Sequence, residues 1–163
     1  VADNLHTIAL HLAALPRDLD KHAPKLMELA SKCSSVAEIT HRRESTAFLL
    51  AGLTRKQACG KEECKQVKKC ENTCKGPVRM VSWQSERDTL IPMLLEAVKT
   101  SPGKPVTYTD HRITYEDAIP DIDGQFDMLY LDAQTNETLA PKLEKYKNTV
   151  TKFLVIHDVL RSI

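Results

Sequence analysis

Acidic and imidazole side chains in this sequence stand at or near the ends of short apolar runs: Glu38, Asp132, His157 and Asp158. If these runs are parallel strands, the sheet brings the four side chains together at the carboxyl ends of its strands, where open α/β sheets bind ligands. Two of these carboxylates, Asp132 and Asp158, could bind a divalent cation there together with the His157 imidazole, because hard cations prefer oxygen ligands. The alternative is that Asp132 and Asp158 cap turns or helix N-termini.

The residues around Glu38 predict a strand, a tight turn and a helix. Residues 35–39 form a short apolar run, a polar turn follows, and an apolar helical run covers about 45–54. Ser45 or Thr46 can serve as the N-cap, because its hydroxyl accepts from the orphan amides of the first helical turn. This arrangement opens a βαβ unit and places a helix N-terminus at the carboxyl end of the first strand.

The rest of the chain alternates between strand and helix patterns. Apolar or β-branched runs predict four further strands, at 78–83, 106–109, 126–132 and 152–158. Periodic apolar positions predict helices at 1–15, from about 20 to 33, at 86–100 and at 137–148. The alternation predicts an α/β fold: a doubly wound, mostly parallel five-stranded sheet with helices on both faces. We expect a single domain, 1–163, that begins with N-terminal helices over 1–33.

Three motifs resemble those of class I S-adenosylmethionine-dependent methyltransferases, a family with a Rossmann-like fold. In one branch the first motif reads approximately Glu-Ile-Gly-x-x-x-Gly-x-Ser-Thr, and four residues match it here: Glu38, Ile39, Ser45 and Thr46. Residues 126–132 are similar to the family's Phe-Asp-x-x-x-x-Asp strand, and residues 153–158 to its apolar strand ending in His-Asp. The motifs keep their order over most of the chain. We expect a sheet without the last two strands usual in that family, either because the sequence is a fragment or because the fold is a minimal version.

This resemblance implies an S-adenosylmethionine cofactor and a small-molecule methyl acceptor. The residues that it places at the cofactor are Glu38, Thr40, His41, Ser45 and Trp83. Those that it places on the acceptor side are Asp132, His157 and Asp158, where some relatives bind a divalent metal. Trp83 could stack on the adenine or belong to the core. Catalysis would rest on proximity and orientation.

The turn at 40–44 departs from the family's motif. Thr40 stands at the place of the first glycine and the second glycine is absent, although those glycines let the backbone approach the cofactor closely. Trp83 or Gln84 stands where an acid usually holds the ribose hydroxyls, and Glu86 comes two residues later. An alternative function is therefore a catalytically inactive Rossmann-like binding module, which has lost the cofactor loop and binds through the arginines of this turn or through the insertion described next.

Residues 55–77 predict an insertion rich in Cys and Lys. From Thr54 to Arg79 there are eight Lys or Arg, three acidic residues and four of the five cysteines: Cys59, Cys64, Cys70 and Cys74. Their C-x4-C-x5-C-x3-C spacing differs from the paired C-x2-C pattern of structural zinc sites. A zinc site, one or two disulfides and free thiols all stay open as alternatives.

Composition gives no argument for nucleic acid or a membrane as a partner. The 163-residue chain has a net charge of +1, so its overall charge gives no attraction to anionic polymers or surfaces. No apolar run approaches the ~20 residues of a transmembrane helix. The odd number of cysteines argues against a complete disulfide framework, and residues 1–16 lack the pattern of a signal peptide. We therefore expect a reducing, cytoplasmic setting. His6, His11 and His22 are expected on helix surfaces, without ligand spacing among them.

Overall fold

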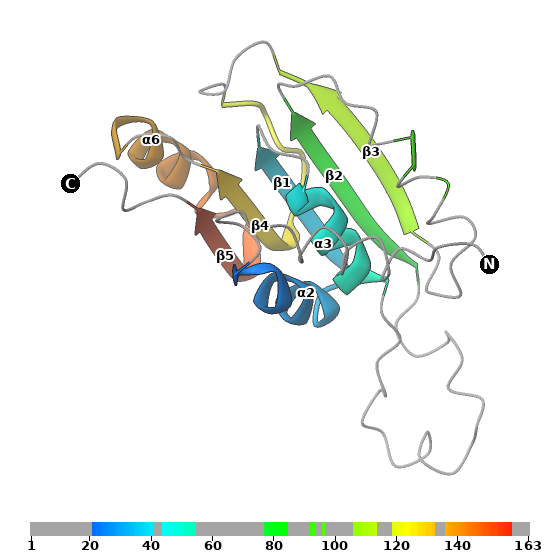
Figure 1. Ribbon diagram of the computed structural model, residues 1–163. Helices are drawn as coiled ribbons and strands as arrows, with labels where there is room; N and C mark the ends of the chain where they lie inside the picture. Colours follow the sequence, from blue (N-terminus) through cyan, green and yellow to red (C-terminus); the bar gives the residue numbers. More distant parts are fainter. Residues whose placement is uncertain are drawn as a thin grey trace.

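A computed structural model describes residues 21–40, 44–54, 77–84, 92–93, 96, 106–113, 119–132 and 136–157. Within them lie α2 (Ala23–Ser31), β1 (Ser35–Thr40), α3 (Glu44–Leu53), β2 (Val78–Gln84), β3 (Val106–Arg112), β4 (Phe126–Asp132), α6 (Asn136–Tyr146) and β5 (Val150–His157). The five strands form one sheet in the order β3-β2-β1-β4-β5, and each neighbouring pair is parallel (Figure 1). The predicted doubly wound parallel α/β fold is confirmed.

The order of the strands follows from their polarity. β1 and β4 are buried along nearly their whole length, as expected for central strands that are covered on both faces. β3 is mostly exposed and forms one border of the sheet. It continues three residues beyond the predicted 106–109, because Asp110, His111 and Arg112 stay in register with β2.

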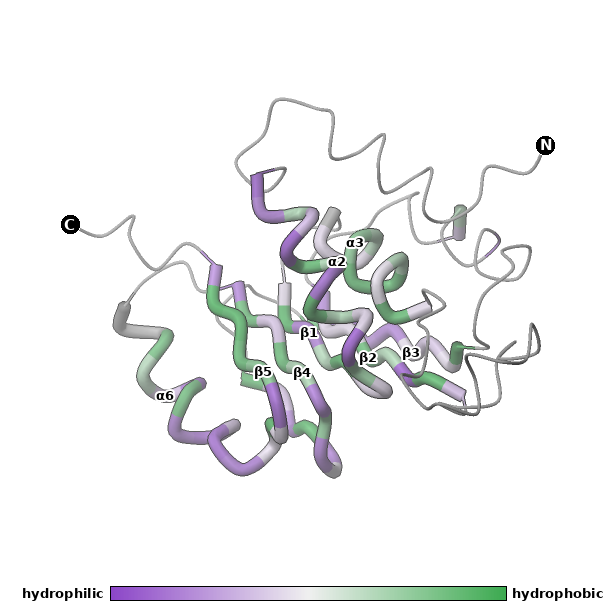
Figure 2. The backbone as a smooth tube through the Cα atoms, turned by 90° about the horizontal axis from the view of Figure 1, so that it is seen from below, coloured by the Kyte–Doolittle hydropathy of each residue, from purple (hydrophilic) through white to green (hydrophobic). Residues whose placement is uncertain are grey.

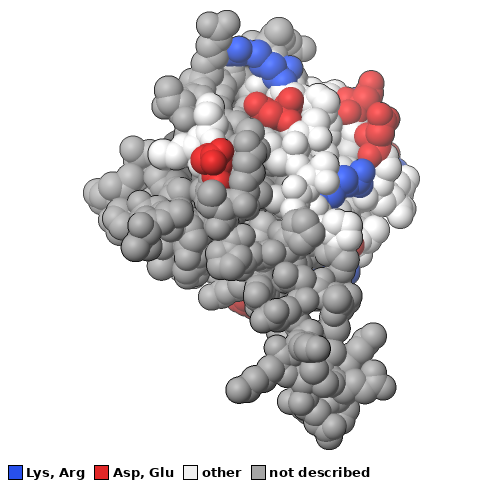
Figure 3. Space-filling view, turned by 90° about the vertical axis from the view of Figure 1, so that its right-hand side faces the viewer, with Lys and Arg blue, Asp and Glu red and all other residues white. Residues whose placement is uncertain are grey.

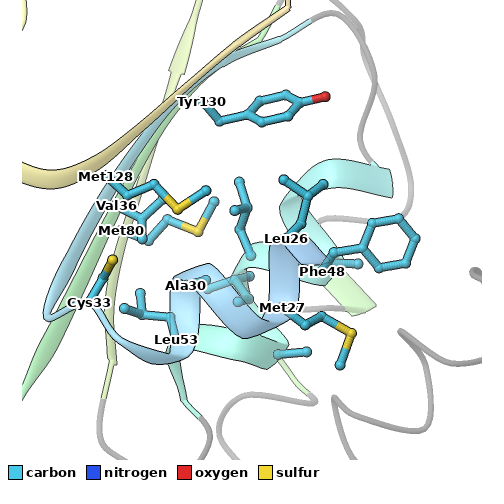
Figure 4. Packing of buried hydrophobic residues seen from close by; sticks show 14 of the residues in the cluster. Leu26, Met27, Ala30, Cys33, Val36, Phe48, Leu53, Met80, Met128 and Tyr130 are labelled. Atoms are coloured by element: carbon cyan, nitrogen blue, oxygen red, sulfur yellow. The ribbon is translucent and has the colours of Figure 1, made fainter. Parts of the chain in front are cut away.

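One apolar core lies between the sheet and the helix pair α2 and α3. Figure 4 shows its packing: Leu26 and Ala30 of α2 face Val36 and Met80 of the strands, and Phe48 of α3 belongs to the same cluster farther from the sheet. Nearly every residue of α3 is buried, so its apolar run is explained by its place between α2 and the sheet. This core fixes the N-terminal end of α3 over the carboxyl ends of β1 and β2.

A second core lies on the opposite face of the sheet, beneath α6 (Figure 2). There Ile39, Leu129 and Leu131 alternate with the strand residues that enter the first core, and α6 contributes Leu143 and Tyr146. The Tyr146 hydroxyl donates to the Pro120 carbonyl at 2.7 Å and so ties the helix to the segment that leads into β4. The predicted helices on both faces are therefore present.

Helices α2 and α3 approach each other closely at Gly52. A Cβ atom at this position would lie 2.3 Å from the carbonyl oxygen of Met27 and 2.8 Å from its Cα. Because those atoms belong to the backbone of α2, they cannot move aside as a flexible side chain would. Gly52 is thus required by the packing of the two helices.

Several predictions fall outside the residues that the structure describes. These are the helix at 1–15, the insertion at 55–77 with its four cysteines except for its last residue, and most of the helix at 86–100, of which 92–93 and 96 are helical. Two predicted site residues, His41 and Asp158, also lie outside the described ranges. The helix expected to run to about residue 33 is α2, which ends at Ser31.

Candidate functional site

Parallel pairing brings the polar strand ends together at the carboxyl end of the sheet. In register, Thr40 of β1 lies beside Gln84 of β2, and Asp132 of β4 lies beside His157 of β5. β1 and β4 pair directly, so Thr40 and Asp132 end neighbouring strands. The order of the sheet reverses between β1 and β4, and open α/β sheets bind ligands at this kind of position.

Side-chain alternation decides which of these residues share a face, because residues two apart on a strand point the same way. Val36 of β1, Met80 of β2 and Tyr130 of β4 belong to the core beneath α2 and α3. The polar residues that follow them at even spacing, together with the end of β5, therefore lie on this same face: Glu38, Thr40, Ser82, Gln84, Asp132 and His157.

Glu38 is fully buried, and both oxygens of its carboxyl group accept hydrogen bonds from side chains of the same protein. Oε2 accepts from the Ser45 hydroxyl at 2.9 Å. Oε1 accepts from the hydroxyl of Thr46 and, at 2.7 Å, from that of Ser82, with Gln84 Nε2 3.4 Å away. The carboxyl group therefore ties the first turn of α3 to β1 and β2.

The Gln84 amide completes this network. Its Nε2 donates to Ser82 Oγ at 2.7 Å and to Thr46 Oγ1 at 2.9 Å. Both hydroxyls give their own hydrogen to Glu38, so they can only accept from Gln84, which orients the amide. Gln84 Oε1 is buried and has no hydrogen-bond partner among the described residues. A buried carbonyl oxygen without a donor costs about 1–3 kcal/mol, so a ligand that donates to this atom would relieve that cost.

Burial also changes the acidity of Glu38. Removal from water penalises the carboxylate and raises the pKa of Glu38 to about 7, while the hydrogen bonds from Thr46, Ser82, Ser45 and Gln84 offset only part of that penalty. Near neutral pH the side chain is therefore present both as the acid and as the carboxylate.

Asp132 and His157 form a second polar pair on the same face. Nδ1 of His157 lies 3.4 Å from Oδ1 of Asp132, and both side chains are buried. The imidazole stacks on Tyr130 with ring centres 6.4 Å apart, and His22, just before α2, meets it edge-on at 6.3 Å. With Nδ1 turned to the carboxylate, Nε2 is the nitrogen that would exchange a proton with a substrate, which is the arrangement of an oriented general base.

Trp83 lies on the other face of the sheet from Glu38, Thr40 and Ser45. It is paired in register with Ile39, belongs to the second core, and stacks on His111 with ring centres 5.1 Å apart. The structure thus brings Glu38, Thr40 and Ser45 together and does not bring Trp83 to them. Of the two uses considered for Trp83, packing in the core is the one that its surroundings match.

No group of three or more His, Cys, Asp or Glu suited to hold a metal ion occurs in the described part of the chain. Asp132 and His157 are two side chains of a kind that can bind a metal ion, and the third one predicted, Asp158, lies outside the described residues. Among the five cysteines only Cys33 is described; it is buried, and its Sγ donates to the carbonyl of Leu29 at 3.3 Å. The alternatives for the four cysteines of the insertion therefore remain predictions.

Three residues of this site were not among the predicted site residues. Ser82 and Gln84 alternate with Trp83 on β2, so the period of two contained the signal, but the face they share with Glu38 depends on the pairing of β1 with β2. His22 reaches His157 although 135 positions separate them. No local pattern links two such distant residues, because their contact depends on how α2 packs against the sheet.

The surface formed by the described residues carries both signs of charge. Figure 3 shows Lys and Arg side chains close to Asp and Glu side chains on one face. Exposed ion pairs of the described residues include those of Glu28 with Lys25 and with Lys32, at 2.8 Å each. Recognition of a ligand at the carboxyl end of the sheet therefore has to come from local groups and not from a broad electrostatic field.

Comparison with protein-family models and with curated proteins found no match for this chain. Among the described residues, no helix has the length and apolar character needed to cross a membrane.

Proposed function

We propose that this protein is an S-adenosylmethionine-dependent methyltransferase-like enzyme that acts on a small molecule at the carboxyl end of its sheet. The observation that carries the proposal is the Asp132–His157 pair, which stands beside the reversal point of a sheet with the order β3-β2-β1-β4-β5. Ligands of open α/β sheets bind at this position. The sequence motifs that resemble the family end at the same place.

The residues at the ends of β1 and β2 fit a ligand with hydroxyl groups. The buried Gln84 Oε1 has no partner among the described residues and would accept from a ribose hydroxyl, in the position where the family usually has an acid. Glu38 is fully buried and bound by four side chains, so it would act by holding Ser45 and Thr46 of α3 in place. Thr40 and the first turn of α3 would then line one side of the cofactor site.

The acceptor side would be formed by His157 and Asp132. A bound cofactor would supply an electrophilic methyl group and would leave as the neutral thioether. His157 Nε2 would accept the proton of the acceptor's hydroxyl or amine, so that the lone pair left on that atom forms the new bond to carbon. Asp132 would hold the imidazole ring and stabilise the imidazolium that forms. The acceptor class is therefore a small molecule with a dissociable proton.

Calorimetry with S-adenosylhomocysteine on the full chain tests this proposal. We expect binding at micromolar ligand. Gln84→Leu should weaken it about tenfold, because it removes the acceptor for a ribose hydroxyl. His157→Gln is the matched control, since it alters the acceptor side and should leave the affinity within about twofold of the parent. Absence of heat at millimolar ligand would overturn the enzyme proposal.

The second candidate function is a catalytically inactive Rossmann-like binding module. The observation in its favour is the state of Glu38, whose carboxyl oxygens are both engaged by the protein's own side chains and which has no exposed surface. A module of this kind would keep the polar network as a structural support for α3. Silent calorimetry together with a cooperative unfolding transition would favour the module.

A further inference from the structure

Two oxygen atoms of described residues lie within reach of the Ser45 hydroxyl, which has one hydrogen to donate. Its Oγ lies 2.9 Å from Glu38 Oε2 and 3.5 Å from Thr40 Oγ1. When Glu38 is ionised, the hydrogen points to Oε2. When Glu38 is neutral, the acid proton can donate to Ser45 Oγ, and the Ser45 hydrogen turns to Thr40. Three oxygens in a row can thus exist in two proton arrangements without movement of the backbone.

The two oxygens of Glu38 are not equivalent. Oε1 already faces the hydroxyls of Thr46 and Ser82 and the amide nitrogen of Gln84, all of which act as donors. A proton on Oε1 would face these donors and displace them. Oε2 faces only the Ser45 hydroxyl among the described residues, and a hydroxyl can accept as easily as it donates. The added proton therefore belongs on Oε2, at the start of the row.

We propose that Glu38 is a buried proton-binding site that exchanges its proton with the carboxyl end of the sheet through the hydroxyls of Ser45 and Thr40. In this relay a proton arriving at Thr40 Oγ1 displaces the Thr40 hydrogen onto Ser45 Oγ, and the Ser45 hydrogen passes to Glu38 Oε2. Each oxygen that gains a hydrogen gives one up, except Glu38, which goes from the carboxylate to the neutral acid. The described part of the route ends at Thr40, the last residue of β1.

The surroundings of Glu38 favour uptake of a proton. α3 and β2 face it with neutral hydroxyls and an amide. On β4, Tyr130 is the residue in register with Glu38. The next residue of β4 on the same face is Asp132, which lies beside His157 of β5. Among the described residues no charged side chain shifts the pKa of Glu38, and a buried carboxylate without a counter-charge is costly. The raised pKa of about 7 agrees with this geometry.

The relay does not depend on cofactor binding, so its test is done without ligand. The full chain is labelled with ¹³C at the glutamate side chains, and the Glu38 carboxyl signal, assigned with Glu38→Gln, is followed against pH. We expect a midpoint near 7, well above those of exposed glutamates at about 4.3. Titration of Glu38 together with the exposed glutamates would overturn the proposal, and a silent cofactor experiment would not.

Exchange between the acid and the carboxylate tests the route itself. Ser45→Ala and Thr40→Val should slow it about a hundredfold, the lower end of what a positioned proton-transfer group contributes, so that the averaged signal broadens or splits. Ser82→Ala removes a donor to Oε1, so it should raise the midpoint without slowing exchange. Thr54→Val is the matched control, because this buried hydroxyl donates to Leu50 and does not contact Glu38. Unchanged exchange in both Ser45→Ala and Thr40→Val would overturn the relay.

Discussion

A single carboxyl group links the fold of this protein to the chemistry of its candidate site. Glu38 joins α3 to β1 and β2 through Ser45, Thr46, Ser82 and Gln84, and it does so without an ion pair among the described residues. Its hydrogen-bond partners are neutral groups that can reorient. The residue therefore supports the structure in both of its protonation states, but not equally well.

Replacement of Glu38 by Gln should remove one source of pH dependence in stability. The pKa of Glu38 is raised from 4.5 to about 7 on folding, so the folded state holds this proton more tightly than the unfolded state does. The stability that Glu38 contributes to the folded state is therefore greatest below pH 4.5 and is lost as the pH rises through 7. The free energy of unfolding should fall by about 3 kcal/mol across this window in the parent.

Urea unfolding at a series of pH values checks this prediction. The Glu38→Gln curve should lack the fall that the parent shows between about pH 4.5 and pH 7. Other carboxyl groups make the same pH-dependent contribution to stability in both proteins, so their effects cancel in the comparison. Asp127 is one example: burial raises its pKa, but hydrogen bonds from Ser34 and Lys152 lower it further, so that the net shift is downward. Parallel curves for parent and variant would contradict a buried titrating Glu38.

At the scale of elements, the contact between α2 and α3 is set by the absence of a side chain. Gly52→Ala should destabilise the protein by about 2 kcal/mol, because the new methyl group would meet the backbone of Met27. In an unconstrained helix the same change would stabilise by about 1 kcal/mol. Chemical denaturation measures the difference, and a more stable Gly52→Ala variant would show that the helices can separate at no cost.

The strands and α3 could be predicted from the sequence because their apolar runs are local signals. β1, β2, β4, β5 and α3 appear within two residues of the predicted bounds. β3 was predicted too short, since its polar last residues are held by pairing with β2 and not by burial. The pairing of β2 with β1 also determines on which face of the sheet Trp83 and Gln84 lie. The part of the site that β2 contributes could therefore not be predicted from the sequence of β2 alone.

At the scale of the whole molecule, the sheet should be most protected at its centre. β1 is paired on both sides and covered on both faces, whereas β3 is paired with β2 only among the described strands and is largely exposed. Amide hydrogen exchange should therefore be slowest in β1 and β4 and fastest in β3. Peptide-resolved mass spectrometry measures this gradient, and equal protection of β1 and β3 would contradict the order of strands.

The two apolar cores touch different faces of the same strands and share few atoms other than the backbone of the sheet. A cavity made on the α6 side, for instance at Leu143, should therefore leave the packing beneath α2 and α3 largely unchanged. Substitutions intended to repack the α6 side can therefore be made while the polar network around Glu38, on the other face of the sheet, is kept unchanged.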